Sequence, residues 1–367
     1  MTAPARNHAI DMYKGLGILL VVAGHAWAVP EPVYKAIYSM HIPAFLLLAG
    51  LMSQPARAAV APGSYVAGKF RRLVLPAWGM GLLLSLPYLA ATGLGRVAPE
   101  EFALRLWGTL SGSAINEWNF VSTPLWYLFC LFWLEALAAC LARWGAAVAG
   151  LVMTALGLAW MLVSQGEATW SDDPPLEWPF ATRATGSAMA FFGCGMWLGA
   201  RGHVAFRRPS LTASRVAALL LVLGLWALTM AASPDVLNLS RNRIAQGPLA
   251  LALNLAAALA GAYVLWQLAV LVPASRLLCW LGQHTLPVFG FNYAVNKLVH
   301  AVLGMAGVRV AHLGAWWWCL AMVELLVLMA LAWLLDRAGP LGDLFNGRPL
   351  GAGRQRLAVR GGQRAVE

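Results

Sequence analysis

Charged residues are scarce in this chain. Only 11% of its 367 residues are Asp, Glu, Lys or Arg, whereas 60% are apolar. A soluble domain of this length needs far more charge to cover its surface, so the composition excludes an ordinary water-soluble protein. The apolar residues instead fall in long runs, which is typical of a polytopic membrane protein.

Cysteine is also sparse, and no feature of the sequence divides the chain into compositionally different halves. The five cysteines all lie in apolar runs without metal-ligand spacing, so we expect packing residues and neither a disulfide framework nor a zinc site. There is no internal repeat and no linker rich in Gly, Ser or Pro. We predict one membrane domain over residues 1–340, followed by a disordered, basic, Gly- and Arg-rich cytoplasmic tail over residues 341–367.

Apolar runs of about 17 to 25 residues predict an all-α bundle of about ten membrane-spanning helices. The first run lacks a small-residue cleavage site, which favours a retained span over a signal peptide. The expected spans cover residues 11–29, 36–53, 73–92, 123–142, 145–164, 185–200, 216–232, 247–272, 279–299 and 313–335.

The placement of lysine and arginine predicts that both ends of the chain lie in the cytoplasm. With the N-terminus inside, the basic clusters before residue 73, before residue 216 and after residue 336 all fall on the cytoplasmic side. The net charge of +11 then needs no nucleic-acid partner, because the excess lies where cytoplasmic segments meet anionic membrane lipid.

Two expected outer connections are long enough to have a function. Residues 93–122 contain tryptophans among polar residues, and residues 165–183 combine Trp170 and Trp178 with four acids. Aromatic rings beside amides and carboxylates suit a sugar-binding surface, but tryptophans also form belts at the membrane interface. Both interpretations stay open, and the candidate sugar-contact residues are Trp118, Asn119 and Trp126.

Two ionisable residues share one face of the first span. Lys14 and His25 are eleven positions apart, which at about 100° per residue returns them to nearly the same side of a helix, ~16 Å apart along its axis. Ionisable groups in a membrane helix must face protein or water, so this pair predicts a polar path into the bilayer. Asp11, three positions before Lys14, is the simplest ion-pair partner for the lysine.

His25 and His41 are the candidate catalytic residues. A buried neutral imidazole is a competent base near pH 7 for acyl transfer to a hydroxyl, while the simpler alternative is a histidine that only packs against a neighbouring helix. A short outer loop separates the two expected helices, which places both imidazoles at similar depth in the membrane. Since no carboxylate ligand lies nearby in the sequence, we expect no metal.

The cytoplasmic end of this path is cationic. Lys69, Arg71 and Arg72 directly precede the third expected span. Arginine forks and lysine charges suit phosphates, so these residues either hold a phosphorylated donor or serve only membrane topology and lipid headgroups.

Three further ionisable residues lie inside later spans. Glu135 and Glu324 are candidates for function because carboxylates are costly in a membrane, although each also suits a simple bond to a neighbouring helix. His284 belongs to the polar run 282–287, whose proline predicts a break in the ninth span. The sequence assigns a role to none of the three.

At these positions the chain resembles the acyltransferase 3 family of integral membrane acyltransferases, particularly members that O-acetylate surface polysaccharides. The similar segments follow the family's order over most of the chain: Asp11-x-x-Lys14-Gly15 through Gly24-His25, His41-x-Pro43-x-Phe45, Lys69 to Pro76, Pro124 to Leu128, and Leu281-Gly282 through Phe289.

The resemblance implies a ten-helix fold in the bacterial cytoplasmic (inner) membrane, acetyl-coenzyme A as the cytoplasmic donor, and a glycan or lipid-linked sugar hydroxyl as the acceptor outside. It gives His25 the place of the family's essential histidine, and it gives Lys14, Lys69 and Arg72 the places of its cations. The two lysines stand where the family commonly has arginine, so they keep the charge and lose the bidentate fork. Asn292 stands where the family often has a histidine.

Together these observations predict a membrane-embedded O-acetyltransferase with His25 as the general base. Acetyl-coenzyme A would be held by Lys14, Lys69, Arg71 and Arg72. Direct transfer and a two-step route through an acetyl-histidine both stay open. A different class also stays open, a transporter or flippase for a glycolipid, in which the same polar face lines a permeation route.

Overall fold

The computed structural model describes residues 7–165, 179–202, 204, 212–233, 236–308 and 314–349. These ranges consist of helices and their connections, with one isolated antiparallel bridge between Asn238 and Arg243. The long helices are α1 (His8–His25), α2 (Glu31–Met52), α4 (Pro62–Gly93), α6 (Trp126–Leu141), α7 (Ala146–Val163), α8 (Thr182–Ala200), α9 (Ala213–Ala232), α10 (Pro248–Leu271), α12 (Thr285–Met305) and α13 (Trp317–Arg337). The shorter helices are α3 (Pro55–Val60), α5 (Pro99–Leu110), α11 (Arg276–Gln283) and α14 (Pro340–Phe345).

Seven segments of the described chain are helical, long and apolar enough to cross a membrane. The prediction of a polytopic, all-helical membrane protein is therefore confirmed, whereas the number of spans stays a prediction. Each of the ten expected runs contains helix. The ninth run is divided between α11 and α12, with the break at His284 that the polar run 282–287 predicts.

Several element boundaries differ from those expected. α1 ends at His25, four residues early, because the chain turns there and Pro30 precedes α2. α4 begins eleven residues before the expected third span. The outer connection 93–122 contains the helix α5, while most of the second long connection, including Trp170, Trp178 and its four acids, lies outside the described residues.

The domain boundary expected at residue 340 also differs from the structure. α14 begins at Pro340, and its Phe345 is buried and packs edge-to-face on Phe291 of α12. Residues 340–349 therefore belong with the membrane domain. The rest of the expected tail, residues 350–367, lies outside the described residues.

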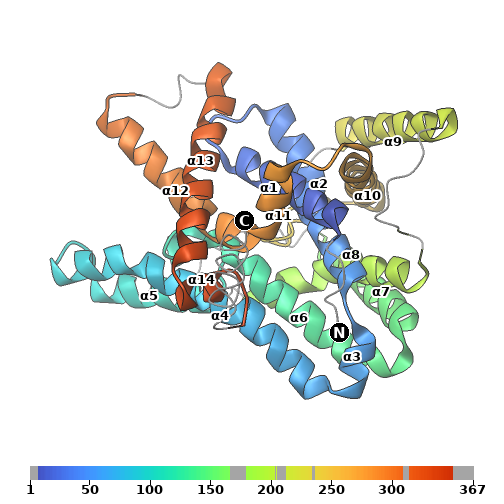
Figure 1. Cartoon of the computed structure of the whole chain (residues 1–367), viewed down its shortest axis with the longest axis horizontal. Helices are drawn as coiled ribbons and strands as arrows, with labels where there is room; N and C mark the ends of the chain where they lie inside the picture. Colours follow the sequence, from blue (N-terminus) through green and yellow to red (C-terminus); the bar gives the residue numbers. More distant parts are fainter. Residues whose placement is uncertain are drawn as a thin grey trace, which may run out of the picture.

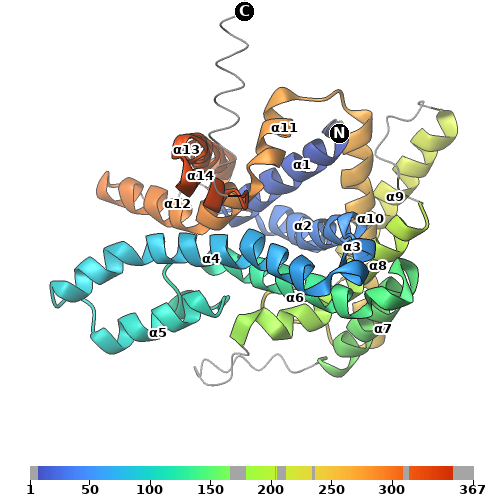
Figure 2. The ribbon, with the colours of Figure 1, turned by 60° about the horizontal axis from the view of Figure 1, so that its bottom comes forward.

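The helices pack in pairs around a shared interior (Figure 1). α7 packs along α8, α8 and α10 pack on α2, and α9 lies outermost beside α10. In Figure 2, α4 lies along α6, and α5 lies beside the far end of α4. α1 is enclosed by α2, α10, α11, α12 and α13, which places both ionisable residues of its polar face inside the bundle.

Glycine permits α1 and α11 to cross very closely. A Cβ atom on Gly15 would collide with the carbonyl group of Leu278, and one on Gly282 would collide with the carbonyl group of Asp11. These contacts fix the start of α1 against α11. They therefore help set the position of Lys14, which follows Asp11 within one turn.

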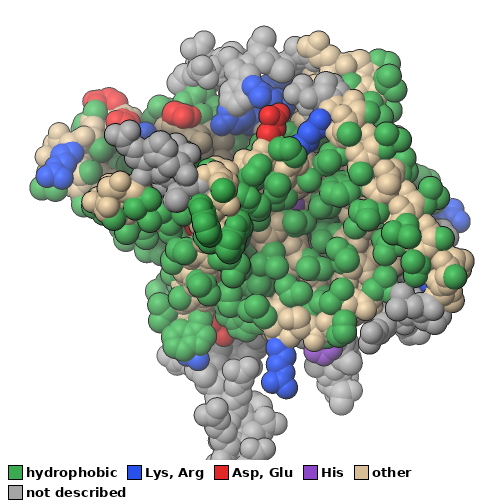
Figure 3. Space-filling model, turned by 90° about the horizontal axis from the view of Figure 1, so that it is seen from above, with side chains coloured by type: hydrophobic (Ala, Val, Ile, Leu, Met, Phe, Trp, Pro, Cys, Tyr) green, Lys and Arg blue, Asp and Glu red, His purple; other side chains and the backbone are tan. Residues whose placement is uncertain are grey.

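The outer surface is apolar in the manner of a protein in lipid. Leucines 82, 86 and 89 of α4 and leucines 220, 221 and 228 of α9 are all more than 45% exposed. Figure 3 shows apolar side chains over most of one face, with charged side chains mainly toward its edges. This distribution is what a hydrocarbon environment requires.

Candidate active site

The imidazole of His25 is fixed by its own helix. Nδ1 lies 2.8 Å from the carbonyl oxygen of Val21, and a carbonyl oxygen only accepts hydrogen bonds. Nδ1 therefore carries the proton in the neutral ring, and the lone pair lies on Nε2. Nε2 lies 3.4 Å from the hydroxyl oxygen of Tyr38. The ring thus has the tautomer that a general base needs, with its basic nitrogen toward α2.

Tyr38 and His41 complete an aromatic cluster with His25. The ring centroids of His25 and His41 are 6.5 Å apart, and the Tyr38 ring lies 4.8 Å from His41. Nδ1 of His41 lies 2.9 Å from the carbonyl oxygen of Ile37, so this buried ring also has its lone pair on Nε2. The structure therefore brings the two predicted histidines together.

The end of α1 is held by Asn296 of α12. Its amide nitrogen donates to the carbonyl oxygen of His25 (2.9 Å) and to Glu324 of α13 (2.8 Å), and its amide oxygen accepts from the indole of Trp27 (2.6 Å). Asn296 and Glu324 are both buried. Glu324 thus supports the position of the His25 backbone through Asn296, which gives this previously unassigned acid a structural role.

A cavity of about 580 Å³ extends from the cationic end of α4 toward this cluster. Its cationic side chains are Lys14, Arg57, Lys69 and Arg72, with Glu135 among them. Its apolar walls include Ile18, Ile42, Phe45, Tyr127 and Phe289.

Part of the apolar lining of this cavity comes from α1 and α2, the helices that carry the two histidines. Ile18 is seven residues before His25 on one face of α1, a rise of ~10 Å, and Phe45 is four residues after His41 on α2. The cavity thus follows the expected polar path along α1 from Lys14 to Ile18, and its lining includes neither histidine.

The predicted cations differ in their environment. Nζ of Lys69 lies 2.5 Å from Glu135, whose carboxylate also accepts from Tyr65 (2.6 Å) and Ser53 (3.0 Å). Arg72 lines the cavity without contacting this network, and Arg71 is exposed and outside the cavity lining. Glu135 therefore holds Lys69 in place and lowers the net positive charge of the cavity.

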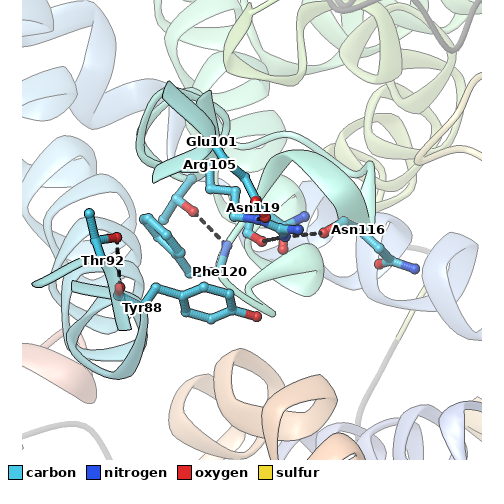
Figure 4. Close-up of polar contacts among 8 residues, drawn as sticks. Tyr88, Thr92, Glu101, Arg105, Asn116, Asn119 and Phe120 are labelled. Carbon is cyan, nitrogen blue, oxygen red and sulfur yellow. Dashed lines mark hydrogen bonds and ion pairs between the residues drawn. The ribbon is translucent and has the colours of Figure 1, made fainter. Parts of the chain in front are cut away.

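The polar run in the loop before α6 has a structural explanation. The amide nitrogen of Asn119 donates to the carbonyl of Ile115 (2.7 Å), and its amide oxygen accepts from the backbone N–H of Ser122 (2.8 Å). Arg105 of α5 reaches both Glu101 and the carbonyl of Asn119 (Figure 4).

These bonds do not support the sugar-contact role expected for Asn119. Its side chain is fully buried and is used to fold the loop. Trp118 and Trp126 are also buried, at 8% and 6% exposure. The three residues therefore present little surface to an acceptor in this structure.

His284 lies apart from the histidine cluster, at the junction of α11 and α12. Its ring stacks on Trp280, with Nδ1 donating to the carbonyl of Trp280 (2.8 Å), and Nε2 lies 3.6 Å from Asp336. Arg348 bonds to the same carboxylate. These contacts fasten the helix break to α13 and to the segment after α14.

Asp11 and the cysteines add no ligand cluster. Asp11 accepts from Gln283 at 3.3 Å, and its expected pairing with Lys14 stays a prediction. None of the five cysteines, all of which lie within the described ranges, forms a disulfide bond. Within the described ranges, no group of three or more His, Cys, Asp or Glu side chains is placed to hold a metal ion.

Sequence reasoning missed Tyr38, Asn296 and Trp27. Tyr38 lies three residues before His41 on one helical face, a spacing that the sequence displays. Asn296 was visible as a second polar residue four positions after Asn292 in an apolar run. Trp27 and Asn296 are 269 positions apart, so their contact was beyond sequence reasoning.

The fold and this interior define a class, a polytopic helical membrane protein whose bundle encloses ionisable side chains beside a cationic cavity. The family model described as "Acyltransferase domain" matches residues 7–337. The chain belongs to this family, acyltransferase 3, and is an integral membrane acyltransferase, as the resemblance indicated. No curated protein and no solved structure matches the chain.

Proposed function

We propose that this acyltransferase moves an acetyl group from cytoplasmic acetyl-coenzyme A to a hydroxyl of a glycan or lipid-linked sugar outside the bacterial cytoplasmic membrane. His25 is the general base. The observation that carries the proposal is the bond from Nδ1 of His25 to the Val21 carbonyl, because it leaves Nε2 as an acceptor beside His41 and Tyr38.

The cavity supports a coenzyme A donor. Its cations, among them Arg72 and Arg57, suit phosphates, and its apolar walls suit the pantetheine arm. An extended arm is of the order needed to cover the ~16 Å between the levels of Lys14 and His25. The histidines are not among the residues that line the cavity, so the thioester end of the donor would have to pass beyond the lining side chains Ile42 and Phe45 of α2.

The proposed reaction needs one proton acceptor. Nε2 of His25 takes the proton of the acceptor hydroxyl while the hydroxyl oxygen attacks the thioester carbonyl carbon. A C–O bond forms and the C–S bond breaks. The imidazolium then gives its proton to the departing thiolate, which returns His25 to its starting state.

Replacing His25 tests the function. In a strain lacking the gene, the wild-type protein should restore acetyl groups on the surface glycan, measured by NMR, and His25→Ala should not restore them at equal protein level. The matched control is His8→Ala, because His8 is exposed at the other end of α1. If the His25→Ala variant still restores acetylation, His25 is not the general base.

The same cells distinguish the transporter alternative. The proposal requires that glycan export continues in the deletion strain and that only its acetyl content falls. Unchanged acetylation together with lost export would contradict the proposal and would favour a transporter.

A further inference from the structure

Asn292 of α12 is fully buried, yet its side chain is unsatisfied. Neither its amide nitrogen nor its amide oxygen has a hydrogen-bond partner within the described part of the chain. A buried polar group without a partner loses its hydrogen bonds to water and gains none in return, so native proteins seldom keep one without a reason. An apolar residue of the same size would avoid this cost.

The position of Asn292 supplies a reason. On α12 it lies three residues after Phe289, which lines the cavity, and four residues before Asn296, which bonds to the carbonyl of His25. Helix geometry places Asn292 about 60° around the helix from Phe289 and about 40° from Asn296. Measured along the helix axis, Asn292 lies ~4.5 Å after Phe289 and ~6 Å before Asn296. Along α12, the Asn292 amide therefore lies between the level of the cavity-lining Phe289 and the level at which Asn296 bonds to the His25 backbone.

The neighbouring residues of α12 face elsewhere. A Cβ atom on Gly290 would contact Met80 and Leu125, and Phe291 packs on Phe345. Asn296 has already committed its amide nitrogen to His25 and Glu324, and its oxygen to Trp27. Of the two asparagines on this side of α12, only Asn292 keeps its donor for a ligand.

We propose that the amide nitrogen of Asn292 donates a hydrogen bond to the thioester carbonyl oxygen during acyl transfer, an inference that rests on the proposed function. As the acceptor oxygen attacks, negative charge develops on this carbonyl oxygen, and the bond from Asn292 strengthens. The amide keeps both of its protons. In the dry interior such a donor stabilises the charged intermediate more than it would in water.

The test is Asn292→Leu, which removes both polar atoms and keeps the side-chain size. Since an unsatisfied group is removed, we expect equal or higher thermal stability in detergent. We expect kcat for transfer from acetyl-coenzyme A to fall about 100- to 1,000-fold. The affinity for free coenzyme A, which lacks the carbonyl, should stay unchanged. Asn292→Ala repeats the test with a smaller side chain.

Asn254→Leu is the matched control. Asn254 is a buried asparagine of α10 whose amide nitrogen also has no partner within the described part of the chain, while its amide oxygen accepts a hydrogen bond from Ser233 (2.9 Å). Its replacement removes the Ser233 bond, so it should lower stability and leave transfer per folded molecule unchanged. For Asn292, transfer within about twofold of wild type per folded molecule would overturn the inference.

The two proposals fail in distinguishable ways. Inactive His25→Ala together with fully active Asn292→Leu overturns only the inference about Asn292. Wild-type protein that transfers no acetyl group from acetyl-coenzyme A overturns both proposals.

Discussion

At the residue scale, backbone carbonyls decide which nitrogen of each histidine can act. Both His25 and His41 bond through Nδ1 to the carbonyl four residues earlier in the same helix. This local bond fixes the tautomer without a carboxylate partner, so the base needs no buried charge beside it. Under the proposed function, the acceptor hydroxyl would have to displace the Tyr38 hydroxyl from Nε2.

Tyr38→Phe tests how much this hydroxyl contributes. The variant keeps the ring, which stacks on Tyr34, and loses the bond to His25. We expect kcat for acetyl transfer to fall less than about tenfold, because the Val21 bond still sets the tautomer of His25. Tyr34→Phe is the control. A loss as large as that of His25→Ala would mean that the Tyr38 hydroxyl takes part in the chemistry.

The donor site makes a second prediction at this scale. Replacing Lys69 and Arg72 together by Gln should weaken acetyl-coenzyme A binding in detergent about tenfold or more, because each charge-assisted bond contributes about 1.5–3 kcal/mol. Arg71→Gln is the control, since Arg71 is exposed beside Arg72 and does not line the cavity. If the double variant binds acetyl-coenzyme A as tightly as the wild-type protein does, Lys69 and Arg72 serve membrane topology and do not bind the donor.

At the scale of elements, α1 carries the site and its two ends are held by different helices. Its start crosses α11 through Gly15 and Gly282, and its end is bonded through the His25 carbonyl to Asn296 of α12. The break at His284 lets α11 and α12 make these two contacts from one expected span. The helix break at His284 thus allows one expected span to hold both ends of α1.

Gly15→Ala should damage the protein through this crossing. The added methyl group meets the Leu278 backbone, which cannot rotate away as a side chain would, so we expect less folded protein and a lower unfolding temperature in detergent. Gly224→Ala in α9 is the control, because nothing lies within 4 Å of its added Cβ. That variant should be neutral or more stable by up to about 1 kcal/mol. Full stability of Gly15→Ala would contradict the close crossing.

At the scale of the whole molecule, the bundle separates a cationic entrance from an aromatic histidine cluster. The cavity begins among cations in the first half of α4, whereas His25 lies where α1 ends and the chain turns toward α2. A donor and an acceptor can then approach from opposite sides of the membrane. This separation depends on the orientation that the lysine and arginine distribution predicts.

Cysteine labelling tests that orientation. In a background without the native cysteines, Arg96→Cys lies between α4 and α5 on the expected outer side, and Arg143→Cys lies between α6 and α7 on the expected inner side. Both positions are exposed. A membrane-impermeant maleimide should label spheroplasts at position 96 and should label position 143 only after lysis. The reverse pattern would invert the assignment of the donor side.

The sequence by itself determined the class, the helical runs and the shared face of Lys14 and His25. Long apolar runs must be helical in lipid, and a helix repeats its faces regularly, so these properties follow from local order alone. The short loop between α1 and α2 similarly predicted that His25 and His41 lie close together.

Only the tertiary structure decided which distant polar groups satisfy each other. Lys69 is paired by Glu135, 66 residues away, and the His25 carbonyl by Asn296, 271 residues away. The tertiary structure also showed that the Asn119 side chain is hydrogen-bonded within its own loop, whereas the Asn292 side chain has no hydrogen-bond partner within the described residues. Such pairings depend on how helices rotate and cross against one another. No local sequence pattern specifies how one helix rotates and crosses against another, because an apolar helix face can pack in several ways.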